Sequence, residues 1–64
     1  MPKLFMCVYN GVKVKVKARK LRSWLRRRLD YPVLVIFRDS WGVHVLAGSG
    51  AELLEDVEKY FTVG

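Results

Sequence analysis

The dipeptide Asn10-Gly11 and the strictly alternating run VKVKVKA that follows it constrain the fold of this chain more than any other feature. Asn-Gly supplies the positive φ angles that a two-residue type I′ turn requires. The segment before it, from Lys3 to Tyr9, is rich in residues that favour strands. The pattern therefore predicts a β-hairpin in which Tyr9 opposes Val12.

In this register the two faces of the hairpin differ in character. One face receives only apolar and aromatic side chains: Phe5, Cys7, Tyr9, Val12, Val14 and Val16. The other face alternates apolar residues with cations: Leu4, Met6 and Val8 beside Lys13, Lys15 and Lys17. A simple solvent side would not be half apolar, so the second face is expected to have a partner of its own.

A helix is predicted after the hairpin, because the apolar period changes from two residues to about 3.6 near Ala18. Its inner stripe comprises Leu21, Trp24, Leu25 and Leu29. Arg28 falls within this apolar sector, so either its side chain extends past Trp24 or the helix frays before it. The residue before Pro32 is pushed out of the helical region, which ends the element.

The second half of the chain repeats this order of elements. The VLVIFR run after Pro32 indicates a buried strand, and VHVLA after the DSWG turn indicates the strand that returns. Ser49 and Glu52 form a capping box for a helix that runs to about Phe61. The halves, residues 1–30 and 31–64, resemble one hairpin-helix unit used twice, although any two such units with apolar periodicity would align about as well.

These elements predict an α+β fold in one domain of residues 1–64. The order β-β-α-β-β-α is most simply built as a four-stranded, mainly antiparallel sheet with two helices packed on one face. A chain of 64 residues has a small core, and its single cysteine cannot form an internal disulfide. We therefore expect a homodimer through the outer sheet face, in which the two sheets stack or edge strands join.

Charge is divided unevenly along the chain, whose net charge is +6. Residues 1–29 carry ten positive and no negative charges, whereas residues 30–64 carry two positive and six negative charges. A one-sided basic footprint is typical of nucleic-acid-binding proteins. The residues expected to contact phosphates are Lys13, Lys15, Lys17, Arg19, Lys20, Arg22, Arg26 and Arg27.

The N-terminal end of the first helix adds weight to this expectation. Lys17, Arg19 and Lys20 crowd an end where the helix dipole is already positive and where no side chain offers a cap. Free N–H groups there would suit a phosphate oxygen. About five phosphate contacts would give a log-log salt slope near −4.5 on duplex DNA.

Duplex DNA is the first expected partner and RNA the second. Base-specific reading is not indicated, because Asn and Gln side chains that read adenine are nearly absent, although arginine could still read guanine. An ordinary solvated surface would explain the strand lysines alone. The alternative function is a protein-interaction module whose basic helix docks on an acidic partner.

The other side chains give little support for catalysis or metal binding. His44 has no obvious carboxylate partner, and Cys7 is expected to pack as a small hydrophobe. Trp41 either stands exposed at a turn beside Arg38, where a base could stack on it, or packs over the end of the core. No catalytic residue, metal ligand set or cofactor is predicted.

The sequence also suggests a cellular setting. It shows no signal peptide and no apolar stretch of membrane-spanning length, so we expect a cytoplasmic protein without a membrane partner. Gln is absent and Asn occurs once, a depletion of thermolabile amides that resembles thermophile proteins.

Overall fold

The structure, a computed structural model, describes residues 3–62. Its elements follow the predicted order: β1 (Leu4–Tyr9), β2 (Val12–Lys17), α1 (Ala18–Arg26), β3 (Pro32–Asp39), β4 (Gly42–Ser49) and α2 (Gly50–Thr62). The first turn has the geometry that its sequence predicts, because φ is 54° at Asn10 and 77° at Gly11.

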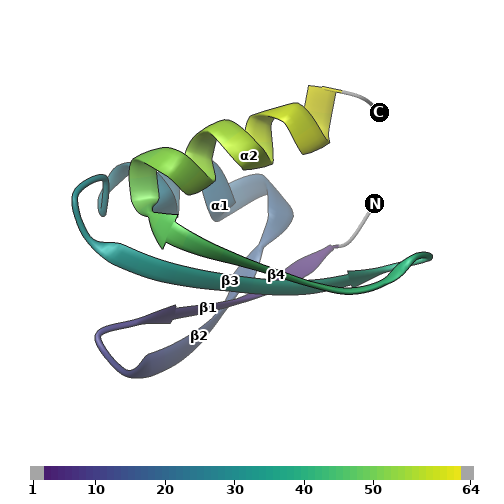
Figure 1. Ribbon diagram of the computed structural model, residues 1–64, viewed down its shortest axis with the longest axis horizontal. Coiled ribbons are helices and arrows are strands. Elements are labelled where there is room, and N and C mark those ends of the chain that lie inside the picture. The colour runs from purple at the N-terminus through teal and green to yellow at the C-terminus, as the bar shows by residue number, and fades with distance from the viewer. Residues whose placement is uncertain (1–2, 63–64) are drawn as a thin grey trace.

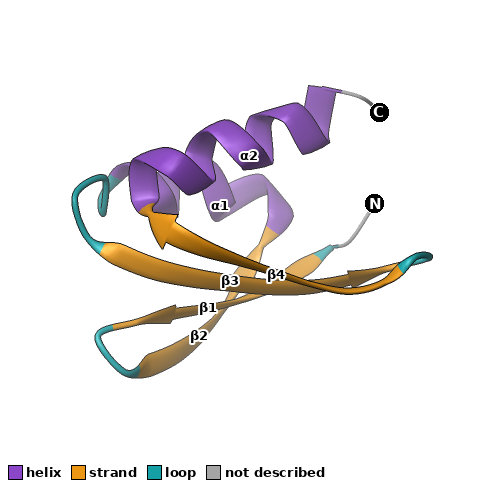
Figure 2. Cartoon of the chain, in the orientation of Figure 1, coloured by secondary structure: helices purple, strands orange, loops and turns teal. Residues whose placement is uncertain are grey.

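The four strands form one antiparallel sheet in the order β2-β1-β3-β4. Both helices cover the same face of this sheet (Figures 1 and 2), with α1 over β2 and β1 and α2 over β4 and β3. The predicted α+β architecture is confirmed. Each half of the chain contributes one hairpin and one helix, whereas the idea that the halves are copies of one unit stays a prediction.

The register of the first hairpin is also the predicted one. Tyr9 opposes Val12, and Phe5 opposes Val16. The second hairpin turns at the predicted DSWG segment, with Asp39 paired to Gly42 and with Ser40 and Trp41 as the two central residues of the turn. Its strands are correspondingly longer than the apolar runs that predicted them.

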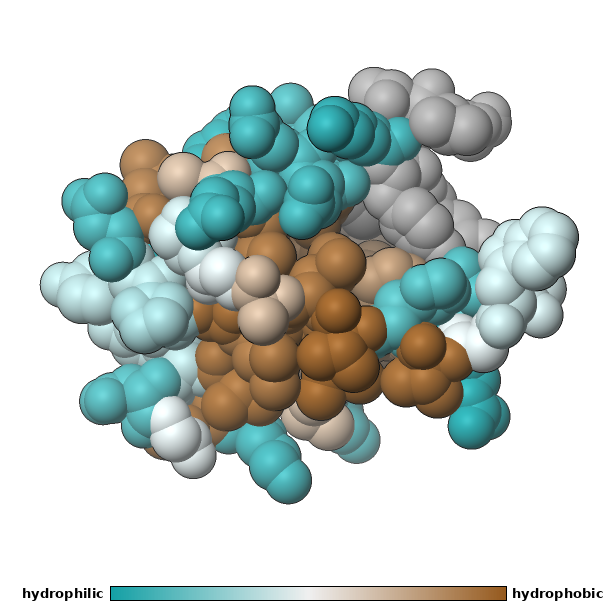
Figure 3. All heavy atoms as spheres, in the orientation of Figure 1, coloured by the Kyte–Doolittle hydropathy of each residue, from teal (hydrophilic) through white to brown (hydrophobic). Residues whose placement is uncertain are grey.

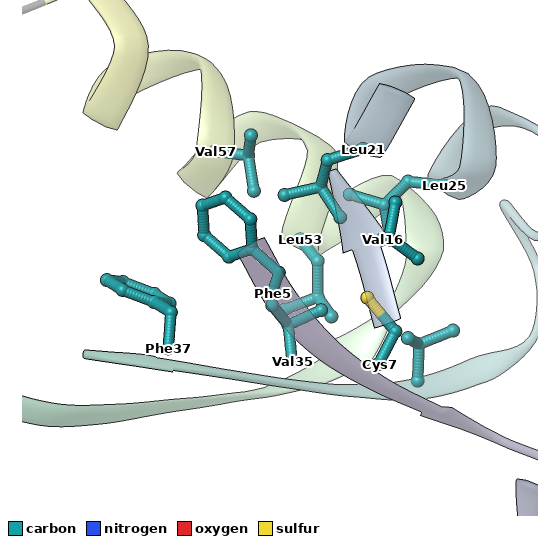
Figure 4. Packing of buried hydrophobic residues seen from close by; sticks show 10 residues of the cluster. Phe5, Cys7, Val16, Leu21, Leu25, Val35, Phe37, Leu53 and Val57 are labelled. Atoms are coloured by element: carbon teal, nitrogen blue, oxygen red, sulfur yellow. The ribbon is translucent and has the colours of Figure 1, made fainter. Parts of the chain in front are cut away.

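The core fills the space between the sheet and the helices (Figure 4). The buried side chains are Phe5, Cys7, Val16, Leu21, Leu25, Val33, Val35, Phe37, Leu53 and Val57. Two predicted members of the apolar inner stripe of the first helix are not fully buried. Trp24 is only half-buried, and Leu29 is 41% exposed because α1 ends at Arg26. The prediction that Leu29 packs inward was therefore wrong.

The two halves meet where α2 begins, against the chain that follows α1. The N–H of Gly50 donates to the carbonyl of Tyr31 at 3.1 Å, and the N–H of Ala51 donates to the carbonyl of Leu29 at 3.1 Å. A Cβ atom at position 50 would lie 2.1 Å from the Arg28 carbonyl oxygen. Only glycine lets the two backbones approach this closely.

We expect Gly50→Ala to destabilise the fold by about 1 to 3 kcal/mol or more, because backbone atoms would have to separate. Helix propensity alone predicts the opposite sign, a gain of roughly 0.5 to 1 kcal/mol. Urea unfolding followed by circular dichroism measures the difference. Ala51→Gly is the control at the next position and should lose only propensity, about 1 kcal/mol. A more stable Gly50→Ala variant would contradict the close approach.

The predicted capping box at the start of α2 is confirmed. The Glu52 N–H donates to the Ser49 Oγ at 3.2 Å, and the Ser49 N–H donates to the Glu52 Oε1 at 3.1 Å. The backbone N–H and then the hydroxyl of Ser49 lower the pKa of the Glu52 carboxyl below its ordinary value of 4.5, since both stabilise the ionised form.

A carboxyl whose pKa is lower in the folded state adds stability above its unfolded pKa, and this stability is lost as pH falls through the folded pKa. We therefore expect Glu52→Gln to be less stable than the natural chain at neutral pH. The difference should shrink as the pH is lowered to about 2, because both side chains are then neutral. Urea unfolding at a series of pH values tests this. A difference that does not change with pH would show that ionisation of Glu52 contributes nothing.

Candidate nucleic-acid interface

The basic helix α1 begins without a side-chain cap, as its sequence predicts. Lys17 occupies the N-cap position with extended backbone angles, and no acidic residue stands in the first turn. The Ala18 N–H, however, donates to the carbonyl of Lys3 at 2.9 Å. The expectation that these N–H groups are all free for a phosphate was therefore wrong for Ala18. The cations carry the argument for this surface instead.

An open cleft of about 520 Å³ lies between β2 and α1. We call it the β2–α1 cleft, and its lining residues are Val14, Lys15, Val16, Lys17, Lys20, Ser23, Trp24 and Arg27. Strand and helix meet here because α1 follows β2 without a loop and folds back over it. Four of the predicted phosphate-binding residues thus border one cleft.

The remaining predicted residues lie elsewhere. Arg19, Arg22 and Arg26 are spaced three and four apart, so they lie together on α1, and they are not among the residues that line the cleft. Arg22 already has an interaction within the fold. Lys13 stands beside the first turn, opposite Val8. Four of the eight predicted residues therefore lie outside the lining of the cleft, and their role in binding stays a prediction.

Most of these cations are exposed and unengaged. The exposed side chains that make no hydrogen bond or ion pair with any residue the structure describes are Lys13, Lys15, Lys17, Arg19, Lys20, Arg26 and Arg27. The carboxylates of the second half are therefore not neutralising them within the described part of the chain. Their charge remains directed at solvent.

Arg28 has a different role from its neighbours. Its guanidinium lies 4.1 Å from the centre of the Trp24 ring and 4.9 Å from that of Tyr9, and its Nη1 donates to the Trp24 carbonyl at 2.9 Å. The sequence left two alternatives for Arg28, an early end of the helix or a side chain that extends past Trp24. Both occur, because α1 ends before Arg28 and its side chain lies over Trp24. Tyr31 completes the cluster with its ring 5.5 Å from Tyr9. Arg28 therefore packs on Trp24, the one aromatic residue among those that line the β2–α1 cleft.

His44 does have a carboxylate partner, contrary to expectation. Its Nε2 lies 2.9 Å from the Asp39 Oδ1, and its ring stacks on Phe37 with centroids 5.0 Å apart. The pair was missed because Asp39 and His44 are diagonal neighbours across the hairpin, where Asp39 opposes Gly42 and Phe37 opposes His44. The same Asp39 oxygen accepts the Trp41 N–H at 2.8 Å, so the carboxylate organises the turn.

Trp41 is 88% exposed at the tip of the β3–β4 hairpin, so it does not pack over the end of the core. Figure 1 shows this tip and the β1–β2 turn at opposite ends of the molecule. Trp41 does not line the β2–α1 cleft.

Cys7 is fully buried, as expected for a small hydrophobe. Burial raises the pKa of its thiol to about 11, although the nearby Arg28 charge acts in the opposite direction. The thiol therefore stays protonated near neutral pH.

Comparison with known proteins identifies no relative: no family model matches the chain, and no curated protein or solved structure is significantly similar to it. Within residues 3–62, no group of three or more His, Cys, Asp or Glu side chains could hold a metal ion. None of the described helices has the length and apolar character needed to cross a membrane.

The neighbouring residues Arg27 and Arg28 provide a matched test of this division of roles. We expect Arg28→Ala to lower the free energy of unfolding by about 2 kcal/mol, because it removes two ring contacts and a hydrogen bond. Arg27→Ala should change it by less than about 0.5 kcal/mol, as is usual for an exposed side chain. Thermal or urea unfolding of both variants is the measurement. Equal effects would contradict the structural role of Arg28.

Proposed function

We propose that this chain binds nucleic acid through the β2–α1 cleft, with duplex DNA as the first choice and RNA as the second. The supporting observation is the group of four exposed cations that border this cleft, Lys15, Lys17, Lys20 and Arg27, without an ion pair to any described residue. A stable fold does not need such uncompensated charge, and a polyanion would neutralise it.

The cleft favours contacts with the phosphate backbone. Its ammonium and guanidinium groups can each bind a phosphate oxygen, and Ser23 adds a hydroxyl that can donate to another. Each neutralised phosphate of duplex DNA contributes about −0.9 to the log-log salt slope, so four contacts predict a slope of about −3.6. Arg19 and Arg26, which lie on α1 outside the lining of the cleft, could add long-range attraction to the same polyanion.

The aromatic residues favour a duplex over a single strand. Binding of single strands relies on exposed rings on which bases stack. The Trp24 ring in the cleft already carries the Arg28 guanidinium on one face, and Trp41 belongs to the far hairpin. Asn10, the chain's single Asn or Gln residue, occupies the first turn. Recognition would therefore depend on shape and charge rather than on adenine-specific hydrogen bonds.

An acidic protein surface is the competing partner for the same cations. Such a partner would also bind less tightly as salt rises, so salt dependence alone does not separate the two functions. Direct titration with a short duplex at physiological salt does, because only the nucleic-acid function predicts measurable affinity for the duplex there.

The double variant Lys20→Glu/Arg27→Glu tests the cleft directly. We expect it to bind a labelled duplex on the order of 100-fold more weakly at low salt, since each reversal replaces an attraction by a repulsion. Its salt slope should be shallower by about 1.8, the contribution of two phosphates. Fluorescence anisotropy at several salt concentrations, against duplex DNA, single-stranded DNA and RNA, provides both quantities.

The control is Arg38→Glu together with Lys59→Glu, which changes the net charge equally but alters neither a residue that lines the cleft nor one that is expected to contact phosphate. It should weaken binding much less than the cleft variant does. Equal loss in both double variants would mean that net charge, and not the cleft, determines affinity. Absence of binding by the natural chain at low salt would exclude the proposed function.

A further inference from the structure

The sheet face turned away from the helices is set by the strand register. Lys15, Met6, Ile36 and Val45 form one row of paired residues across the four strands. Lys13, Val8, Leu34 and Ala47 form a second row. The third comprises two separate pairs, Leu4 with Lys17 and Arg38 with Val43. We call these twelve residues the outer face.

The outer face is mostly apolar and carries no acidic residue. Eight of its twelve residues are aliphatic or Met, and its three lysines stand together on the edge strand β2. Leu4, Val43 and Val45 are 52%, 60% and 58% exposed. In Figure 3 hydrophobic residues gather across the front of the molecule, where β4 runs, below the hydrophilic residues of α2. Contiguous apolar surface of this kind marks an association site.

The two edge strands of the sheet, β2 and β4, differ in the charge that they present on the outer face. Where β2 presents Lys13, Lys15 and Lys17, the matching positions of β4 present Val43, Val45 and Ala47. Lysine on an edge strand discourages further association. The β2 side of the outer face is thus protected by charge, whereas the β3 and β4 side is left apolar.

From this face we infer that a second copy of the chain stacks on it, sheet against sheet. This inference does not depend on nucleic-acid binding, although Lys15 and Lys17 belong both to the outer face and to the lining of the β2–α1 cleft. Two identical twisted sheets fit each other when their strands cross at about 30°. A flat bilayer would touch only part of a twisted sheet, and a nucleic acid would meet eight apolar side chains without one aromatic ring.

Charge selects the orientation of the second copy. A two-fold axis parallel to the strands places β2 of each copy over β4 of the other, so the two lysine columns lie at opposite edges of the stack. An in-plane axis across the strands would place β2 over β2. The two lysine columns would then face each other across a sheet spacing of about 10 Å, and their ammonium groups would meet and repel between the sheets. The first arrangement also covers Val43 and Val45 with the lysine stems of the partner.

The size of the face limits the strength of the dimer. Specific interfaces usually involve about 20 to 30 residues from each partner, roughly twice the number on the outer face. We therefore expect a dissociation constant on the order of 10 µM. Because association buries apolar surface, it should not weaken as salt rises, in contrast to the binding of a polyanion.

Sedimentation velocity of the full chain from about 1 to 500 µM tests the inference, with Val45→Lys and Leu4→Lys as the disrupting variants. Each substitution enters a two-fold interface twice, so each should raise the dissociation constant at least about 100-fold. Val12→Lys is the matched control. Val12 is also 58% exposed but belongs to the opposite face of the sheet, so this variant should dimerise like the natural chain.

Circular dichroism of all three variants checks that each of them is folded. A natural chain that stays monomeric throughout the concentration range overturns the inference, as does a dimer that Val12→Lys abolishes equally. A dimer lost in Val45→Lys but kept in Leu4→Lys would instead indicate joined β4 edges. Sedimentation with vesicles of phosphatidylcholine and phosphatidylglycerol tests whether the outer face binds a membrane instead. If the natural chain is monomeric and binds the vesicles, and Leu4→Lys does not bind them, the outer face is a membrane-binding surface.

Discussion

The contact between the start of α2 and the chain after α1 joins the two halves of this fold, together with the β1–β3 pairing and the shared core. At Gly50 the backbones are so close that a single methyl group would overlap the Arg28 carbonyl. The adjoining N–H groups satisfy carbonyls of Leu29 and Tyr31 that follow the end of α1. This junction determines where both helices lie on the sheet, and the positions of the helices in turn determine the cleft beside β2.

The same arrangement separates charge from apolar surface. The helices use their apolar sides for the core, so α1 directs cations both toward β2 and away from it. Arg28 is the exception, because its guanidinium is held between Trp24 and Tyr9. Its Nε is buried without a hydrogen-bond partner among the described residues, a cost that the two aromatic contacts offset.

Local patterns predicted the fold well because each corresponds to a short-range rule. Asn10-Gly11 determined the first register, and the pair Ser49 and Glu52 marked the start of α2. The errors concern contacts between distant residues. No local pattern reveals that Gly50 packs on the end of α1, and the early end of that helix moved Leu29 to the surface. Knowing which of the basic residues line the cleft likewise required the position of the helix on the sheet.

Cys7 shows what deep packing means for reactivity. Its thiol is enclosed between β1, its neighbouring strands and the helices, and burial keeps it protonated. An oxidant could attack it only after the sheet and the helices had separated. Oxidation would therefore report loss of the native state and could not act as a reversible signal in the intact protein.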